Sequence, residues 1–342
     1  MEKSAKKVLL GLSGGVDSST SAILLKNKGY DVTGYYFDII GDKRDLEEVN
    51  RVAKELDIPL IYEDVSKEFN EIVIENFVSE YINGRTPNPC IICNPNVKFK
   101  NLLKKADELG FDYIATGHYA KIKKIDGIYY IEKAENKEKD QTYMLYRLNQ
   151  DVLKRLIFPL GEFSSKDEIR ELAKENLLEN AEKKDSQEIC FTEDYKEFIK
   201  SRGHKMKKGN FVNLEGKILG KHEGIINYTI GQRKGLGIAL GKPSFVVDID
   251  AEKNEIKIGD NEDLFSNIIT SKDNFFTNKG LLLKSDDIKA KIRYSHHESE
   301  VSVKLENQSL IATFKDNQRA ITKGQSIVFY KDDLVLGGGI ID

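Results

Sequence analysis

The stretch Val8-Leu9-Leu10-Gly11-Leu12-Ser13-Gly14-Gly15-Val16-Asp17-Ser18-Ser19 decides the fold of the N-terminal part of this chain. Its apolar start predicts a short strand buried on both faces, as in a parallel sheet. A Ser-Gly-Gly turn follows, and a helix is expected from about Ser18 to Lys28, ended by Gly29. Strand, glycine turn and helix N-terminus together form an anion site, because free backbone N–H groups and the helix dipole face it.

The spacing of the glycines excludes two common kinds of nucleotide-binding loop. No Lys-Ser or Lys-Thr follows the glycines, as a Walker loop requires, and they are adjacent rather than spaced as in a dinucleotide fingerprint. The stretch resembles the pyrophosphatase-type loop of enzymes that cleave ATP between the α and β phosphates. Ser13, Ser18 and Ser19 are expected to add hydroxyl donors. Asp17 would repel phosphate unless Mg²⁺ lies between them. The plain alternative is an ordinary glycine turn before a helix.

Strands and helices alternate through the first half of the chain. Apolar patterns predict strands at 32–37, 60–62 and 113–116, and helices at 44–56, 69–81 and 99–109. This order predicts a parallel sheet with ligand sites at the carboxyl ends of its strands. Three loops are expected at that edge: residues 11–18, the turn after Phe37, and residues 116–118.

The second half becomes β-rich. A hairpin is predicted around Asp126-Gly127, a capping box at 165–168 opens a helix through Glu175, and a last helix is expected at 195–201. We therefore expect an α/β + β protein. A Rossmann-like parallel sheet of the pyrophosphatase-loop (adenine nucleotide alpha hydrolase-like) type occupies 1–205. A small β-rich central domain follows at 206–270, and a C-terminal β-barrel at 271–342.

Composition and charge bound the function. The 342 residues carry a net charge of −3, and three cysteines do not suggest a disulfide framework. No apolar run approaches the ~18 residues of a membrane span and the start does not resemble a signal peptide, so we expect a cytoplasmic protein without a membrane partner. Residues 196–245 hold 11 Lys and Arg against 3 Glu, which predicts a basic face for a polyanion. The alternative is a lysine-rich solvated surface.

The cysteines are the candidate reactive groups. Cys90 and Cys93 form a Cys-x-x-Cys in a segment that holds three of the six prolines, and Cys190 lies about a hundred residues later. A helix predicted from Val97 places the two thiols near its positive end, which favours the thiolate. Structural zinc normally takes four ligands, and because the chain has only three cysteines, a structural zinc site is not expected. Two interpretations stay open: Cys190 carries a persulfide with Cys93 as partner thiol, or all three cysteines hold a [4Fe–4S] cluster with one open iron.

ATP cleavage beside reactive thiols points to sulfur transfer, and here the sequence resembles the MnmA (TrmU) family of tRNA-uridine 2-sulfurtransferases over nearly its whole length. The matching stretches are 11–19, 84–89, 115–119, 139–141, 184–186, 189–191, 229–237, 323–325 and 336–340. One departure concerns Cys90, where many members have Asp in a proposed acid–base role. A Cys there puts that role in doubt and favours the cluster.

The resemblance implies a role for each matching residue. ATP would be held by Gly11, Leu12, Ser13, Gly14, Gly15, Val16, Asp17, Ser18, Phe37 and Gly117. The target base would meet Asn88, Pro89 and Cys90, and tRNA would contact His118, Lys139, Asp140, Gln141, Arg293, Tyr294 and Gln325. Cys190 would carry the persulfide, with Cys93 as its partner.

The implied reaction is ATP-dependent 2-thiolation of the wobble uridine of tRNA. ATP adenylates the C2 oxygen, sulfur attacks C2, and AMP leaves; the base must first leave its stack. The expected cofactors are ATP, Mg²⁺ and a [4Fe–4S] cluster, and the expected partners are tRNA and a sulfur donor such as a cysteine desulfurase or sulfur-relay protein. The alternatives are a pyrophosphatase-loop ligase or amidotransferase acting on a small molecule, and a non-catalytic nucleotide-gated RNA-binding protein. Neither explains the thiols together with an intact loop.

Overall fold

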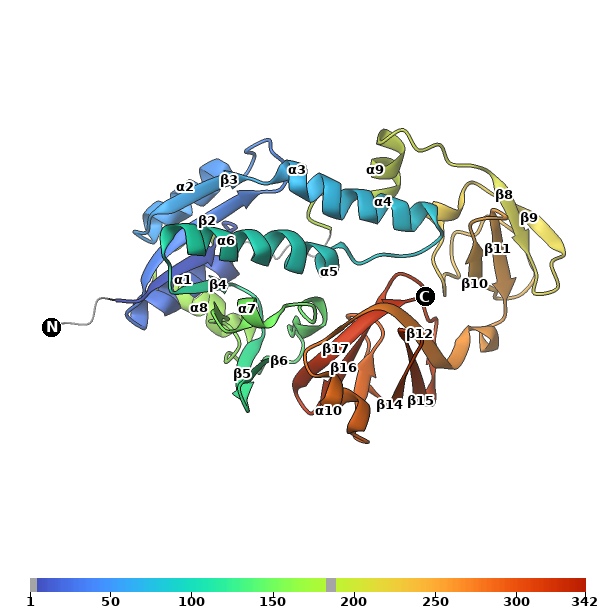
Figure 1. Cartoon of the computed structure of the whole chain (residues 1–342). Helices are drawn as coiled ribbons and strands as arrows, with labels where there is room; N and C mark the ends of the chain where they lie inside the picture. Colours follow the sequence, from blue (N-terminus) through green and yellow to red (C-terminus); the bar gives the residue numbers. More distant parts are fainter. Residues whose placement is uncertain (1–4, 183–188) are drawn as a thin grey trace. The chain divides into compact units, whose positions relative to one another are not determined.

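A computed structural model describes residues 5–182 and 189–342, and the chain forms two compact units. The first contains Met1–Val73, Cys90–Gln187 and Asp333–Leu336. The second contains Ile74–Pro89, Glu188–Asp332 and Gly337–Asp342. Figure 1 colours the chain from its blue N-terminus to its red C-terminus.

The first unit is built on a parallel sheet, as the alternating pattern predicts. Its strands lie in the order β3 (Leu60–Asp64), β2 (Asp31–Asp38), β1 (Lys7–Gly11), β4 (Tyr113–Thr116) and β7 (Leu156–Ile157), and every pairing between neighbours is parallel. The carboxyl ends of β1, β2 and β4 therefore lie next to one another. This arrangement confirms the predicted fold class and defines the edge where a ligand is expected.

Helices cover both faces of this sheet. Val8 and Leu10 of β1 belong to the same core cluster as apolar residues of α1 (Val16–Asn27) and α2 (Leu46–Glu55). Since side chains alternate along a strand, Leu9 points to the other face, where α6 (Phe99–Leu109) packs against β1 and β4. Burial on both faces explains the unbroken apolar run in the sequence.

The cysteine segment differs from its prediction. Helical structure begins at Pro89 with α5 (Pro89–Cys93) and continues through a π-helical turn, η2 (Asn94–Lys98), into α6; it does not begin at Val97. Proline suits a first helical turn, where its missing N–H costs no bond, and the wider turn accommodates Pro95 inside the helix. The predicted helix at 69–81 is likewise interrupted: α3 (Ser66–Phe69), π-helical η1 (Asn70–Ile74) and α4 (Glu75–Ile82) follow one another.

Local turn and cap signals are confirmed. The hairpin of β5 (Lys121–Ile125) and β6 (Ile128–Glu132) turns at Asp126 and Gly127, whose φ angles are 48° and 82°. Ser165 and Glu168 form the predicted capping box of α8 (Lys166–Glu175). The remaining elements of this unit are η3 (Thr142–Met144), α7 (Gln150–Leu153) and η4 (Glu179–Glu182).

The second unit carries the β-rich part and α9 (Tyr195–Ser201). One sheet has the order β10 (Phe245–Asp250), β11 (Glu255–Gly259), β8 (Gly209–Val212) and β9 (Ile218–His222). The short helix η5 (Ile225–Asn227) follows β9 along the chain, and η6 (Glu262–Leu264) follows β11. A barrel follows: β12 (Phe265–Phe276), β15 (Ser309–Arg319), β14 (Ser299–Glu306), β13 (Lys289–Lys291), β16 (Ser326–Lys331) and β17 (Leu334–Ile341). Pairing of β12 with β17 closes it, as predicted.

One helix of this unit was not predicted from the sequence pattern. A short helix, α10 (Lys279–Lys284), interrupts the barrel strands, and the Asn278 side chain caps it by accepting the Leu281 N–H at 2.9 Å. Residue 270, the last of the predicted central domain, lies within β12, and the domain bounds stay a prediction.

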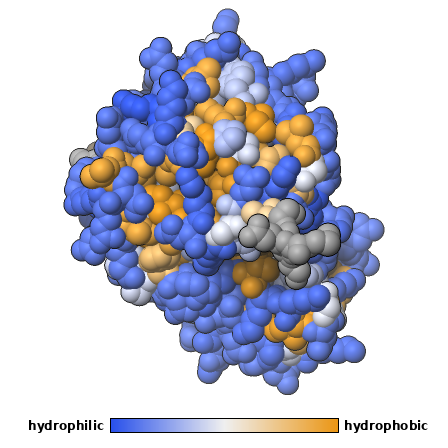
Figure 2. Space-filling model, turned by 90° about the vertical axis from the view of Figure 1, so that its left-hand side faces the viewer, coloured by the Kyte–Doolittle hydropathy of each residue, from blue (hydrophilic) through white to orange (hydrophobic). Residues whose placement is uncertain are grey.

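The visible surface is mainly hydrophilic. Figure 2 shows patches of hydrophobic residues between hydrophilic ones on one face. No helix within residues 5–182 and 189–342 is long and apolar enough to cross a membrane.

Candidate active site

The loop between β1 and α1 is held by its own hydroxyl groups. The Ser13 N–H donates to Ser18 Oγ at 3.2 Å, and the hydroxyls of Ser18 and Ser19 each donate to the Gly15 carbonyl at 3.0 Å. Gly14 has a φ of +76°, which only glycine adopts without strain. Ser19 is fully buried. Its hydroxyl therefore supports the loop, and its role as a phosphate donor stays a prediction.

Gly117 lies directly against this loop. A Cβ atom at Gly117 would lie 2.9 Å from both the Asp17 carbonyl carbon and the Ser18 nitrogen. A Cβ at Gly11 would lie 3.4 Å from Thr116 Cγ2 and 3.6 Å from Phe37 Cε1. The ends of β1, β2 and β4 thus converge, as expected for three loops at one sheet edge, and glycine is required where two backbones meet.

Asp17 in the first turn of α1 has protein partners. Its Oδ1 accepts hydrogen bonds from the Lys166 ammonium at 2.5 Å and the Tyr119 hydroxyl at 2.7 Å. Lys166 supplies the positive charge that the sequence pattern leads one to expect from Mg²⁺. A single carboxylate bonded to lysine does not fit a magnesium site, and Mg²⁺ at Asp17 stays a prediction.

Asn180 supports the same loop from η4. Its Nδ2 donates to the Gly14 carbonyl at 2.7 Å and lies 2.9 Å from Ser19 Oγ. Sequence reasoning missed both Lys166 and Asn180. The capping box predicts where α8 starts, but it does not indicate that Lys166, the first residue of α8, contacts Asp17. No sequence pattern links Asn180 to Gly14, 166 residues earlier.

The turn after Phe37 is ordered by Asp38. One carboxylate oxygen accepts the N–H groups of Ile40 and Gly41, at 3.0 and 2.7 Å, and the other accepts that of Lys43 at 2.9 Å. The Asp38 side chain thus fixes the backbone beyond β2. Phe37 itself is partly buried, and its ring packs against that of Tyr35 with 5.6 Å between the ring centroids.

His118 lies among aromatic rings after β4. Its Nδ1 is 2.8 Å from Thr116 Oγ1, and its ring centroid lies 5.7 Å from that of Phe99 and 6.1 Å from that of Phe158. Burial lowers the pKa of His118 well below its usual range, and the Lys98 charge acts in the same direction. The imidazole is therefore neutral near pH 7 and offers tRNA no positive charge.

The 139–141 segment is tied to the strand end. Gln141 Oε1 accepts the Tyr119 N–H at 2.9 Å. Asp140 is buried, and its carboxylate accepts the Ala134 N–H at 3.1 Å and the Thr142 hydroxyl at 2.6 Å. Asp140 and Gln141 shape this loop, while Lys139 is partly exposed.

Cys90 and Cys93 lie in α5, and the thiolate prediction is wrong for this conformation. Cys93 is buried, and burial raises the pKa of its thiol. Cys90 is exposed as a residue, yet the protein around its sulfur displaces enough water to raise that pKa as well. Lys98 acts in the opposite direction for both, but loss of water outweighs it. Asn94 fixes the following turn by donating to the Met144 carbonyl at 2.8 Å.

Cys190 is exposed and precedes an aromatic anchor. The ring of Phe191 meets that of Phe77 edge-on at 5.2 Å and that of Phe198 at 5.2 Å. Beside them, Tyr81 stacks on Tyr195 at 4.5 Å. The packing of Phe191 therefore holds the backbone in place one residue after Cys190. The 184–186 motif lies outside the described residues.

The remaining predicted tRNA contacts belong to the second unit. Gln325 Nε2 donates to the Thr86 carbonyl at 2.8 Å, next to the segment that carries Asn88 and Pro89. The Arg293 guanidinium donates to the Ala320 carbonyl at 2.7 Å and to the Thr322 hydroxyl. Tyr294 is 38% exposed. Gln325 and Arg293 thus stabilise their loops, and Tyr294 presents a surface ring.

The predicted site residues divide between the two units. The first unit holds Gly11–Ser18, Phe37, Cys90, Cys93, Gly117, His118 and 139–141; the second holds Asn88, Pro89, Cys190, Arg293, Tyr294 and Gln325. Among the residues that the structure describes, no group of three His, Cys, Asp or Glu side chains could hold a metal ion. A cluster on the three cysteines stays a prediction.

Comparison with known proteins identifies the family. Three family models match in succession: the tRNA methyl transferase HUP domain at residues 6–194, the tRNA methyl transferase PRC-barrel domain at 196–260, and the aminomethyltransferase beta-barrel domain at 266–341. A tRNA-specific 2-thiouridylase of Clostridium tetani is 49% identical, covering 100% of this chain and 98% of its own. Relatives of the same name in Clostridium botulinum and Clostridium perfringens are 51% and 48% identical, with 98% of each chain covered. The chain belongs to the MnmA family of tRNA-specific 2-thiouridylases.

Proposed function

We propose that this protein is a tRNA-uridine 2-sulfurtransferase that uses ATP to thiolate C2 of the wobble uridine. The observation that supports the proposal is the close approach of Gly117 to Asp17 and Ser18, at the sheet edge where the free backbone N–H groups of α1 can hold an anion. It occurs in a chain related over its whole length to 2-thiouridylases. The small-molecule ligase alternative has no such support.

The first step is adenylation of the uridine. The C2 oxygen attacks the α-phosphorus of ATP, the bond to the β-phosphate breaks, and pyrophosphate leaves. The loop 11–18 holds the phosphates with backbone N–H groups at the N-terminus of α1. Lys166 lies 2.5 Å from Asp17 and supports phosphate binding by offsetting that carboxylate.

The second step transfers sulfur. The terminal sulfur of a Cys190 persulfide attacks C2, its proton is released, AMP leaves, and the base is joined to Cys190 through a disulfide. The Cys93 thiolate then attacks the Cys190 sulfur, which forms a Cys93–Cys190 disulfide and releases 2-thiouridine. An external dithiol reduces that disulfide, and a sulfur donor reloads Cys190. Because burial raises the pKa of Cys93, its proton must be lost before attack.

The reaction is tested with purified protein, unmodified tRNA, ATP and a persulfide donor. We expect 2-thiouridine, detected by mass spectrometry, and AMP in equal amounts, both dependent on tRNA. Cys93→Ser and Cys190→Ser should each abolish thiolation and leave ATP binding intact. Normal thiolation by either variant would overturn the cysteine roles; AMP formation without tRNA would favour the ligase alternative.

The sulfur source is tested separately by anaerobic purification with iron and sulfide analysis. About four irons per chain, lost in Cys90→Ala, would support the cluster that the sequence favours. A colourless protein that thiolates tRNA from a persulfide donor would assign the sulfur to Cys190. No step above depends on a cluster.

A further inference from the structure

The short helix η4 is anchored in the core of the first unit. Leu178 and Ala181, on either side of Asn180, are each 4% exposed, and both belong to the core cluster that contains the apolar residues of α1. Asn180 itself is 4% exposed. A side chain packed in this way cannot follow a shifting loop, so its hydrogen bonds fix the loop that they reach.

The Asn180 amide acts on two consecutive carbonyls of the glycine turn. Its Nδ2 donates to the Gly14 carbonyl at 2.7 Å and to Ser19 Oγ at 2.9 Å. The Ser19 hydroxyl in turn donates to the Gly15 carbonyl at 3.0 Å. Asn180 therefore holds the Gly14 carbonyl directly and the Gly15 carbonyl through Ser19.

These two partners also set the orientation of the Asn180 amide. The reverse orientation would place Oδ1 against the Gly14 carbonyl, and two acceptors cannot bond to each other. In the part of the chain that the structure describes, Oδ1 is buried and has no hydrogen-bond partner. Because an unpaired buried oxygen costs stability, the stability of the fold alone does not explain an amide at this position.

The direction of a carbonyl sets the direction of the next N–H group. In a trans peptide the C=O of one residue and the N–H of the next point in opposite directions, and the peptides of this turn are trans. With the Gly14 and Gly15 carbonyls held, the N–H groups of Gly15 and Val16 point away from the groups that hold them. Gly15, the N-cap of α1, has no side chain that could accept these N–H groups. They are therefore available to an anion at the start of α1.

We propose that Asn180 is a positioning residue of the nucleotide site, which directs the Gly15 and Val16 N–H groups at the phosphates of ATP. This inference rests on the proposed function and adds to that site a residue outside the glycine loop. Both hydrogen bonds of Asn180 go to residues 14–19. Asn180 should therefore affect the binding of phosphate and leave the binding of adenosine unchanged.

The test compares the affinities for ATP and for adenosine by calorimetric titration. Asn180→Leu keeps the approximate size of the side chain and removes both hydrogen bonds without adding charge. We expect its Kd for ATP to rise roughly tenfold, while its Kd for adenosine stays at the wild-type value. In thiolation assays its KM for ATP should rise by a similar factor with kcat nearly unchanged, as expected when binding common to substrate and transition state is lost.

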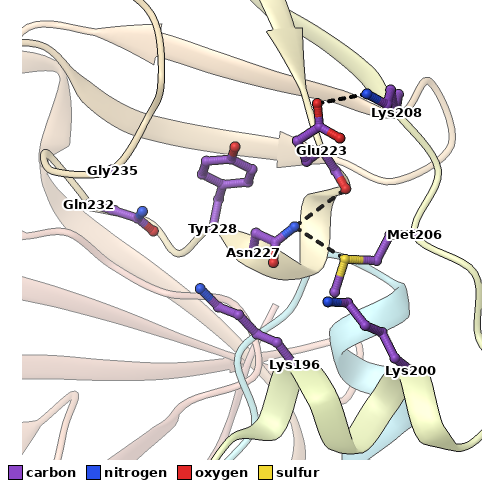
Figure 3. A pocket seen from close by; sticks show the side chains of 9 residues that line it. All are labelled: Lys196, Lys200, Met206, Lys208, Glu223, Asn227, Tyr228, Gln232 and Gly235. Carbon is purple, nitrogen blue, oxygen red and sulfur yellow. Dashed lines mark hydrogen bonds and ion pairs between the residues drawn. The ribbon is translucent and has the colours of Figure 1, made fainter.

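Asn227→Leu is the matched control. Asn227 also lies in a short 3₁₀-helix, η5 of the second unit, and its amide donates to the Gly224 carbonyl at 3.2 Å and to Met206 Sδ at 3.4 Å (Figure 3). This variant should bind ATP as wild type does. Asn180→Ala, which removes the same two hydrogen bonds without a bulky apolar group, should give the same rise in Kd as Asn180→Leu and replaces it if that variant does not fold.

Two results would overturn the inference. One is wild-type ATP affinity in a folded Asn180 variant. The other is an equal loss of affinity for ATP and adenosine, which would mean that Asn180 serves only the stability of the unit. Either result leaves the proposed function standing when wild-type protein still thiolates tRNA. Wild-type protein that binds no ATP would overturn both.

Discussion

Lys166 and Asp17 form an ion pair at the start of α1, with 2.5 Å between Nζ and Oδ1. Their side chains are 10% and 29% exposed, so water screens the pair only in part. The pair leaves the start of α1 without the net negative charge that Asp17 alone would bring.

Lys166→Ala should therefore weaken ATP binding, because Asp17 would then face the phosphates uncompensated. We expect a roughly tenfold higher Kd, equal to about 1.4 kcal/mol, by calorimetric titration. Lys174→Ala, which removes an exposed lysine of the same helix paired with Glu182, serves as the control and should bind as wild type. Equal affinities for the two variants would contradict the role of Lys166.

Gly117→Ala should disrupt the nucleotide loop. The new methyl group would lie 2.9 Å from backbone atoms of Asp17 and Ser18, and backbone cannot move aside as a flexible side chain can. We expect ATP binding to fall at least tenfold and stability to fall by about 1–3 kcal/mol in urea unfolding. Gly280→Ala, whose added Cβ would meet nothing nearer than 3.7 Å, is the control. Unchanged ATP binding in Gly117→Ala would argue against this edge as the nucleotide site.

The sequence predicts the fold where local signals decide it. The β4 bounds follow directly from a short apolar run. The expected helix at 195–201 is α9, which the Asp194 side chain caps in the structure. The helix at Pro89 was missed because several prolines in a short segment indicate a loop, and only tertiary packing reveals the helix. The Lys166–Asp17 pair joins residues 149 positions apart, and no periodic pattern encodes such a contact. The raised pKa of Cys93 likewise depends on burial, which neighbouring residues do not disclose.

His118 should make stability depend on pH. Because burial lowers its pKa, the folded imidazole stays neutral where the unfolded one, with a pKa of about 6.5, takes up a proton. Lower pH then favours the unfolded state, at a cost of up to about 1 kcal/mol between pH 6.5 and 5.5. His118→Gln should lose less stability over this interval in urea unfolding, whereas His204→Gln, at an exposed position, should behave as wild type. The same pH dependence in His118→Gln as in wild type would mean that the folded imidazole also ionises.

Phe191 should act on sulfur transfer by positioning its neighbour Cys190. Its ring is held by Phe77 and Phe198, each with centroids 5.2 Å away, so Phe191→Ala removes the anchor next to the exposed thiol. We expect thiolation to fall at least tenfold and stability to fall by about 2 kcal/mol, because the side chain is only partly buried. ATP binding should not change, since the loop 11–18 belongs to the other unit.

A loss of stability alone would lower every activity together, so the ratio of thiolation to ATP binding is the decisive readout. The conservative variant Phe191→Leu keeps an apolar anchor and should restore most of the thiolation. Alkylation of Cys190 by iodoacetamide should be faster in Phe191→Ala than in either wild type or Phe191→Leu, because the thiol is then less confined. If Phe191→Ala thiolates at the wild-type rate, the aromatic cluster serves stability only and Cys190 is positioned by other contacts.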